Sequence, residues 1–460
     1  MRIKEEWKKS GYFWLPQNGD KKIPGTLSIL DGGKVELEVV GLFDESIEAF
    51  NGNDPLGRII GHVEKDGLVT LEDCSYRTKT IAFGGISKSI VHVDRLISGV
   101  AYGKDEAVTF NTVSFVVEGI NEWVGITGIN VTRSSDYKTA TIDYTPQQEI
   151  IYDLEKGFKL HIHFGYTLPG FPSTTEARIT HQTYFKLSSE DAKEFLEFST
   201  VINQLTYLLG FAVDSTVTIS DVSATSNEIV MEISEGKTRP VTIKLYYPSL
   251  PFSDDAPKID IHKMLFRFSD ISENAGHVFN KWLSTYSVIL PSIGLYFSAV
   301  SGAHKYLDGK FLALAQGLET YHRRTSDETM RDESEFRSMV ASLLWSCPKK
   351  NRKWLRGRLY QGNELNLGQR IKKIIKPYKS FLGNSKQQNR FIRGVVNTRN
   401  YYTHYSEELE KDAVKGSELW WLCQKMEAVF QLHLLQQLEF EDSDIQRILR
   451  DNYKLKQKFN

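Results

Sequence analysis

The segment from Gln387 to Tyr405, QQNRFIRGVVNTRNYYTHY, decides how the C-terminal half of this chain is interpreted. At 3.6 residues per turn its apolar side chains form one stripe, made of Phe391, Ile392, Val395 and Val396. The same spacing then continues onto polar side chains, namely Arg399, Asn400, Thr403 and His404. A charged side chain on the packed face of a helix needs a partner, because an unpaired buried charge is costly. The partner is an acid of the same chain, a second copy of the chain, or a substrate phosphate.

Arg399, Asn400 and His404 are the candidate catalytic residues. Arginine presents a permanently charged planar fork that fits phosphate oxygens, histidine exchanges protons near neutral pH, and the asparagine can orient either group. These groups suit metal-free RNA cleavage, in which the 2′-OH attacks the adjacent phosphate and leaves a 2′,3′-cyclic phosphate and a 5′-OH. Arg399 and His404 lie about 140° apart around an ideal helix. They therefore converge only if the helix bends or if two copies of the motif face each other.

A basic block from Trp345 to Asn400 precedes this segment and overlaps most of it. It contains 15 lysines and arginines and a single carboxylate, Glu364. Such a run repels itself unless an anion binds it, and the aromatic residues within it can stack on unpaired bases. We therefore expect RNA as a partner, the alternative being a solvated helix face with core aromatics. The candidate RNA-binding residues are Arg323, Lys372, Lys373, Lys376, Arg390 and Arg393.

The chain divides into a β-rich and a helical part. Residues 1–255 alternate with a period of two, for example over 33–41, 110–117 and 159–164, with turn signals at 31–33, 51–55 and 66–67. One helix is expected in this part, over 188–210. Beyond it, helical periodicity predicts helices over 275–289, 293–322, 333–346, 352–360, 366–382, 386–404 and 417–439. The sequence thus predicts an α+β protein, with an antiparallel sandwich or barrel-like domain over 1–255 and an all-α region over 256–460.

Charge divides in a similar way. Residues 1–300 carry 28 lysines and arginines against 39 acids, whereas residues 301–460 carry 29 against 19. The net charge of −1 is therefore an average over an acidic and a basic part. This split suggests that the acidic part docks on or shields the basic part in the resting protein.

The composition excludes several classes of protein. With 40% hydrophobic residues among 460, the chain is neither disordered nor collagen-like. Its cysteines, Cys74, Cys347 and Cys423, are far apart and lack zinc-site spacing, which favours a cytoplasmic location. Charges interrupt the N-terminus, so no secretory signal is expected. The uncharged stretch 282–303 is interpreted as two buried helices broken at Pro291 rather than as a membrane span.

Other motifs give little support for further chemistry. His161 and His163 share one face of a predicted strand and could ligate zinc with His181, but two ordinary sheet histidines are the favoured interpretation. No P-loop, GxGxxG or GxSxG motif occurs, so nucleotide hydrolysis and serine-hydrolase chemistry lack support. We expect neither a metal nor a cofactor.

The sequence RNYYTH at Arg399–His404 resembles the R-x4-6-H motif of HEPN ribonucleases, and the chain as a whole resembles the ApeA-like HEPN proteins. Further segments fit this resemblance, namely Gly11–Pro16, Pro24–Leu27, Val35–Gly41, Gly119–Trp123 and Leu318–Arg324. The resemblance implies an all-α HEPN domain with its core at about 305–440, homodimerisation, a composite active site and metal-independent RNA cleavage. It also implies antiphage defence by abortive infection through degradation of host RNA, with tRNA as one target. The N-terminal domain would then sense a trigger such as a phage protein.

By this resemblance Arg399 would hold the scissile phosphate, His404 would act as general base or acid, and Asn400 would occupy the polar position of the motif. Glu319, His322 and Arg323 either line the same cleft or form a surface helix with i,i+4 pairing. Two other functions stay open. One is a non-catalytic RNA- or protein-binding HEPN adaptor, and the other is a structural dimeric sensor in which Arg399 pairs with Glu407 or Glu408 across the dimer interface.

Overall fold

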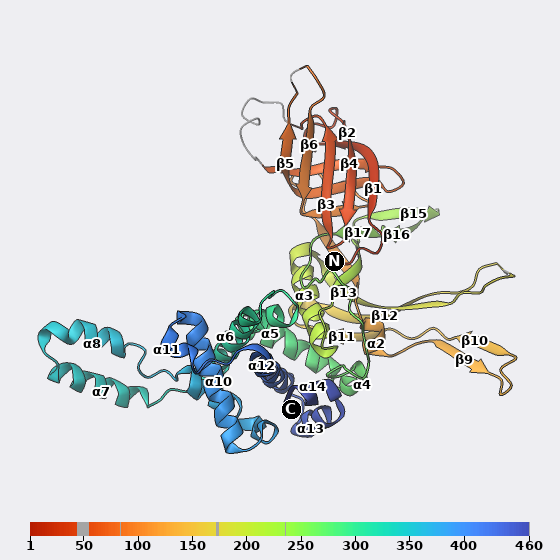
Figure 1. Cartoon of the computed structure of the whole chain (residues 1–460). Coiled ribbons are helices and arrows are strands. Elements are labelled where there is room, and N and C mark those ends of the chain that lie inside the picture. Colours follow the sequence, from red (N-terminus) through yellow and green to blue (C-terminus); the bar gives the residue numbers. More distant parts are fainter. Residues whose placement is uncertain (44–54, 83, 172–173, 235, 460) are drawn as a thin grey trace. The chain divides into compact units, whose positions relative to one another are not determined.

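The computed structural model describes residues 1–43, 55–82, 84–171, 174–234 and 236–459 (Figure 1). The turn expected at 51–55 therefore lies almost entirely outside the described residues. Contacts group the chain into two units, Met1–Leu283 and Ser284–Asn460, and the division falls within helix α5 (Ala275–Val300). The first unit is rich in antiparallel strands and the second is helical, which confirms the predicted α+β class.

Six strands of the first unit close into a barrel, drawn in red and orange in Figure 1. They are β1 (Trp7–Trp14), β2 (Ile23–Leu30), β3 (Lys34–Val40), β4 (Pro55–Val63), β5 (Gly67–Thr80) and β6 (Lys88–Val93). Closure follows from β6, which pairs with both β3 and β5. Alternate residues of β3, Val35, Leu37 and Val39, point into the barrel core as their period of two predicted.

The same sheet continues beyond the barrel through seven further strands. They are β7 (Arg95–Ser98), β8 (Thr109–Val117), β11 (Ile150–Asp153), β12 (Lys159–Thr167), β13 (Thr180–Glu194), β14 (Ile219–Thr225) and β17 (Ile243–Tyr246). Two separate hairpins are formed by β9 (Ile129–Arg133) with β10 (Ala140–Tyr144) and by β15 (Val230–Ser234) with β16 (Lys237–Pro240). Short helical segments are α2 (Ile120–Val124), η1 (Glu155–Gly157) and α4 (Phe268–Ile271).

The helix expected over 188–210 begins later than predicted. Helix α3 (Phe195–Ala212) packs against β8 and β13, and residues 188–194 belong to the end of β13. Ser188 pairs with Thr112 of β8, so the sheet satisfies backbone groups that the sequence assigned to a helix N-terminus. Strand pairing with distant residues therefore overrides the local capping pattern at Ser188.

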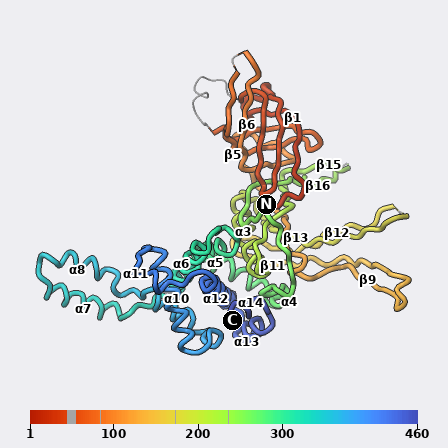
Figure 2. The backbone as a smooth tube through the Cα atoms, in the orientation of Figure 1, coloured from red at the N-terminus to blue at the C-terminus, as the bar shows by residue number. Residues whose placement is uncertain are grey.

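The helical unit is built around α12 (Gly416–Gln437), which packs against α6 (Leu307–Thr325). The other helices are α7 (Glu333–Ser346), η2 (Lys349–Asn351), α8 (Arg352–Leu359), α9 (Leu367–Ile374), η3 (Lys376–Leu382), α10 (Ser385–His404), α11 (Glu407–Glu410), α13 (Asp442–Asp451) and α14 (Tyr453–Phe459). Helices α9 and α10 pack on α6, whereas α7 and α8 project from the rest of this unit as a hairpin (Figure 1 and Figure 2).

Helix α5 corrects the prediction of a break at Pro291, because it continues through that residue to Val300. Ile289 and Ile293 are fully buried on either side, and this packing offsets the one backbone hydrogen bond that proline removes. The chain leaves the helix at Gly302, which has a φ of 78°, so the single helix expected over 293–322 is divided between the end of α5 and α6. α5 is the one helix among the described residues that is long and apolar enough to cross a bilayer, a property that core helices of water-soluble proteins share.

A buried histidine gives the helical core a pH dependence. His433 of α12 donates from Nε2 to the carbonyl of Ile374 at 2.8 Å, and its burial lowers its pKa to about 4. The native state therefore binds fewer protons than the unfolded state between about pH 4 and 6.5, and its stability falls as the pH falls through that window. Between pH 7 and pH 5 we expect the free energy of unfolding of wild type to fall by about 2 kcal/mol more than that of His433→Gln, measured by urea unfolding.

Candidate active site

Helix α10 carries the RNYYTH motif, and its N-terminus is fixed by a local signal. The Asn384 side chain accepts hydrogen bonds from the backbone N–H groups of Lys386 and Gln387, and the Gln387 side chain accepts from the Asn384 N–H at 2.8 Å. This reciprocal capping box sets the start of the helix. Tyr405, with a φ of 50°, ends it directly after His404. The motif thus occupies the last turn and a half of a well-defined helix.

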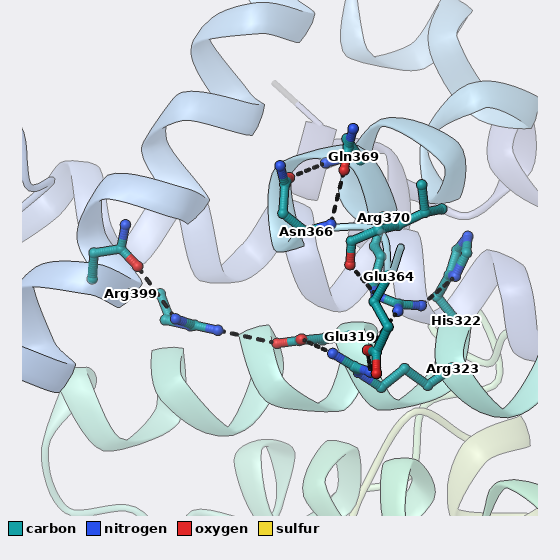
Figure 3. A network of polar contacts seen from close by, with 10 residues as sticks. Glu319, His322, Arg323, Glu364, Asn366, Gln369, Arg370 and Arg399 are labelled. Atoms are coloured by element: carbon teal, nitrogen blue, oxygen red, sulfur yellow. Dashed lines mark hydrogen bonds and ion pairs between the residues drawn. The ribbon is translucent and has the colours of Figure 1, made fainter. Parts of the chain in front are cut away.

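Arg399 projects from α10 toward α6, where it meets a carboxylate (Figure 3). Its Nη2 lies 3.3 Å from Oε2 of Glu319, and its Nη1 donates to Oδ1 of Asn400 at 3.3 Å. The Arg399 side chain is 34% exposed, so solvent and a ligand can still reach the guanidinium. The intramolecular acid that the sequence left open as one partner of Arg399 is therefore Glu319.

The contact extends into a network of alternating charges (Figure 3). Glu319 also pairs with Arg323 at 3.2 Å, and Arg323 bonds to Glu364, which lies 3.5 Å from Arg370. Arg370 is almost fully buried, and it donates to the carbonyl of Leu365 at 2.9 Å. Three guanidiniums therefore share two carboxylates, which leaves the network with an excess of positive charge.

His322 lies at the buried end of this network. Its Nδ1 is 3.2 Å from Nη1 of Arg370, and burial together with the charge of Arg370 lowers the pKa of His322. The imidazole is therefore neutral near pH 7, and its Nδ1 can accept a hydrogen bond from the Arg370 N–H. Burial and the neighbouring Arg323 likewise lower the pKa of Arg370. His322 thus positions Arg370 and lies beneath the site.

A cavity of about 520 Å³ opens over the exposed end of the network. The polar residues that line it include Glu319, Arg323, Gln361, Glu364, Arg399 and Asn400. Glu319 and Arg323 form an i,i+4 ion pair, and both also line the cleft. The two alternatives given for these residues therefore do not exclude each other. An excess positive charge beside a half-exposed guanidinium suits the binding of a phosphate group.

His404 is not among the residues that line this cavity. It lies exposed at the last position of α10, beside a group of tyrosines in which the rings of Tyr401 and Tyr405 are 5.5 Å apart. Thr403, on the same stripe, is also exposed and bonds back to the Arg399 carbonyl. Within one chain, the structure thus brings Arg399 and Asn400 together and leaves His404 facing solvent.

The candidate RNA-binding residues are all exposed, and Arg323, with its side chain 44% exposed, is also paired with Glu319. Arg390 pairs with Glu418 at 3.3 Å, and Lys373 pairs with Glu328 at 2.9 Å. Of this set, Arg323 alone lines the cavity of Arg399. The rest of the set lies on α9, η3 and α10: Lys372, Lys373, Lys376, Arg390 and Arg393.

Sequence reasoning noted Glu364 as the single carboxylate of the basic block but gave it no role. Glu364 instead links Arg323 of α6 to Arg370 of α9. A signal was available, since Glu364 is the single carboxylate among 15 cations between residues 345 and 400. A lone acid in such a run is a natural candidate for a structural ion pair.

His161 and His163 of the β-rich unit do not form a shared site with His181. His161 bonds to Ser188 at 2.7 Å and His163 contacts Glu149 at 3.1 Å, whereas His181 contacts Tyr144 and stacks on Phe164. Lys186 and His161 lower the pKa of Glu149 to about 2, against the opposing effect of its burial. Among the described residues no group of three or more histidine, cysteine or acidic side chains is arranged to hold a metal.

Comparison with known families agrees with this division of the chain. A family model described as ApeA N-terminal domain 1 matches residues 8–282, which is more than half of the chain. A second model, described as Apea-like HEPN, matches residues 312–444 and includes Glu319, Arg399 and His404. No curated protein and no solved structure matched the chain. The two matches cover the β-rich unit and the helical site in the expected order, and the chain therefore belongs to the ApeA-like HEPN family.

Proposed function

We propose that this protein is a metal-independent endoribonuclease that cleaves host RNA, with tRNA as the first substrate to test. Membership in the ApeA-like HEPN family associates it with HEPN nucleases of antiphage defence. The observation that supports the proposal best is the position of Arg399, partly exposed in a cavity above a network in which three guanidiniums share two carboxylates. Such a site offers a phosphate a charge-assisted, two-pronged contact.

In the proposed mechanism a phosphate of the RNA displaces Glu319 from the Arg399 guanidinium. Asn400 holds the guanidinium in place through its existing contact. The 2′-OH attacks the phosphorus, its proton passes to a general base, and the 5′-oxygen leaves with a proton from a general acid. Arg399 stabilises the extra negative charge on the phosphoryl oxygens in the transition state. His404 is the proposed proton carrier.

Because His404 faces solvent at the end of α10, we propose that a second copy of the chain brings its own His404 to the Arg399 cavity. The active form is then a homodimer through the helical domain. The β-rich unit is proposed to sense a trigger such as a phage protein, in the cytoplasm, so that RNA is degraded only in infected cells. Release of activity would then stop phage growth by abortive infection.

The direct test maps the ends of RNA incubated with the protein in EDTA. Wild type should yield 2′,3′-cyclic phosphate and 5′-OH ends, and Arg399→Ala and His404→Ala should yield none above background. If the three proteins produce the same ends, or if cleavage by wild type disappears in EDTA and returns with Mg²⁺, the proposal is wrong.

Removing the competing carboxylate should strengthen RNA binding. Glu319→Gln keeps the size of the side chain but frees Arg399 from an ion pair, and such partly exposed pairs contribute up to about 1 kcal/mol. We expect a two- to five-fold lower Kd for a 2′-O-methyl RNA at low salt, measured by fluorescence anisotropy. Asp444→Asn, which removes a carboxylate 3.3 Å from Arg447 outside the cavity, is the matched control. Equal effects of the two variants would mean that only net charge matters.

A second candidate function is a non-catalytic HEPN module that binds RNA or protein. The pairing of Arg399 with Glu319 and the separation of His404 from their cavity favour it, since both are consistent with a structural role. The same end-mapping experiment separates the two. Wild-type binding of RNA without any cleavage, with or without a phage-derived trigger, would support the adaptor.

A further inference from the structure

The hairpin of α7 and α8, together with Tyr360, forms a projecting segment that we call the basic arm (residues 333–360; Figure 1 and Figure 2). It contributes little to the core: Phe336 is the one buried residue of α7, and α8 has none. Its aromatic side chains are directed outward instead, with Trp345 84%, Trp354 64% and Tyr360 84% exposed. Large aromatic side chains left in water on a projecting element indicate a contact surface.

The charge of this arm has a single sign from residue 336 to residue 360. That stretch contains seven cations and no carboxylate: Arg337, Lys349, Lys350, Arg352, Lys353, Arg356 and Arg358. Arg337 is paired with Glu333 at 2.9 Å. Apart from Arg352, the remaining cations have no ion pair or hydrogen bond to any residue that the structure describes. The arm thus presents uncompensated positive charge, which attracts a polyanion.

Arg352 has a different role, because it fixes the connection between the two helices. Its Nε donates to the carbonyl of Cys347 at 3.0 Å and its Nη2 donates to the carbonyl of Trp345 at 3.1 Å. These bonds hold the end of α7 against the start of α8. The exposed side chains on both sides of the turn are therefore carried by an ordered hairpin.

One face of this hairpin alternates charge and aromatic surface. Trp354 and Arg358 of α8 are four residues apart, so they lie on one side of that helix, about 6 Å apart along its axis, and Lys350 of η2 lies four residues before Trp354. Together with Lys353 and Gly357 they line a shallow cavity of about 630 Å³. Apart from its two chain neighbours and the backbone of its own helix, no described atom lies within 4 Å of where a Cβ of Gly357 would be, which leaves the groove beside Trp354 open.

We propose that the basic arm binds single-stranded RNA, with an unpaired base stacked on Trp354 and the flanking phosphates on Lys350 and Arg358. An aromatic face accepts any base, and cations on either side follow the backbone. A membrane helix would separate its polar and apolar residues onto opposite faces, whereas here they interleave on one face. The choice of RNA rests on the proposed function, but binding at the arm does not depend on cleavage. The arm therefore captures substrate outside the Arg399 cavity, which it does not line.

The test uses the full-length protein and a fluorescein-labelled, unstructured 2′-O-methyl RNA, which lacks the nucleophile and cannot be cleaved. Trp354→Ala should raise the Kd by about 5- to 100-fold, whereas Trp354→Phe should stay near wild type because it keeps a stacking surface. Trp420→Ala removes an exposed tryptophan from α12 and is the matched control. A blunt RNA duplex of equal length should bind at least five-fold more weakly, because its bases are already stacked.

Salt dependence tests the phosphate contacts separately. The double variant Lys350→Ala/Arg358→Ala should reduce the slope of log K against log salt by about 1.4, since each single-strand phosphate contact contributes about 0.7. Unchanged Kd and slope in all arm variants would overturn the proposal. The proposal would also be wrong if the arm variants kept their RNA affinity but no longer bound phosphatidylserine vesicles. The same holds if they kept their RNA affinity but no longer self-associated in sedimentation. RNA bound at the arm but never cleaved would refute the proposed nuclease and leave this inference intact.

Discussion

Arg399→Ala is expected to lower the rate of RNA cleavage by about 10³-fold, the loss typical of removing a group that stabilises transition-state charge. RNA affinity should fall much less, because the other cations of the helical unit remain. The measurement is single-turnover cleavage at saturating protein, with the Kd determined on 2′-O-methyl RNA. Arg399→Lys should recover little, since an ammonium group lacks the planar fork that contacts two phosphate oxygens.

Mixing two inactive proteins decides whether the site is shared between chains. In a dimer that joins Arg399 of one copy to His404 of the other, Arg399→Ala and His404→Ala complement each other in one of the two sites. Random exchange of subunits should then restore about one quarter of wild-type activity, because half of the dimers are mixed and each has one complete site. A mixture as inactive as its components would place both groups in one chain, or exclude the composite site altogether.

The largest expected effect on stability is at Glu427, a buried carboxylate on α12. It bonds to Lys458 of α14 and lies 3.2 Å from Lys310 of α6. Although its burial acts in the opposite direction, these two ammonium groups lower the pKa of Glu427. Glu427→Ala leaves two cations without their shared partner, so we expect a loss of about 3–5 kcal/mol in the free energy of unfolding.

Chemical denaturation of the full-length protein measures this loss, and Glu418→Ala on the same helix is the control. Glu418 pairs with Arg390, but both side chains are largely exposed, so its removal should cost at most about 1 kcal/mol. Because the pKa of Glu427 is lower in the native state than in the unfolded chain, its contribution is complete above about pH 4.3 and is lost as the pH falls further. Glu427→Gln should lose less stability than wild type as the pH falls below about 4.3. An unchanged dependence on pH would contradict a lowered pKa of Glu427.

Much of the secondary structure around the site was predictable from local sequence. The expected helices over 333–346 and 386–404 correspond to α7 (Glu333–Ser346) and α10 (Ser385–His404), because capping groups and helical period act within a few residues. The corrections at Ser188 and at Pro291 have the opposite origin. In each case a local signal for a helix start or break was overruled by pairing or packing with distant residues.

The sequence by itself determined the chemistry available to this protein: a guanidinium, an amide and an imidazole on one helix, after a block of cations with interleaved aromatics. Only the tertiary structure decided which groups meet. Glu319 reaches Arg399 across 80 residues, and Glu364 joins α6 to α9, because helix packing places side chains that no local pattern relates. The separation of His404 from the Arg399 cavity, by contrast, follows from the sequence, since a spacing of five residues turns the two side chains to different sides of one helix.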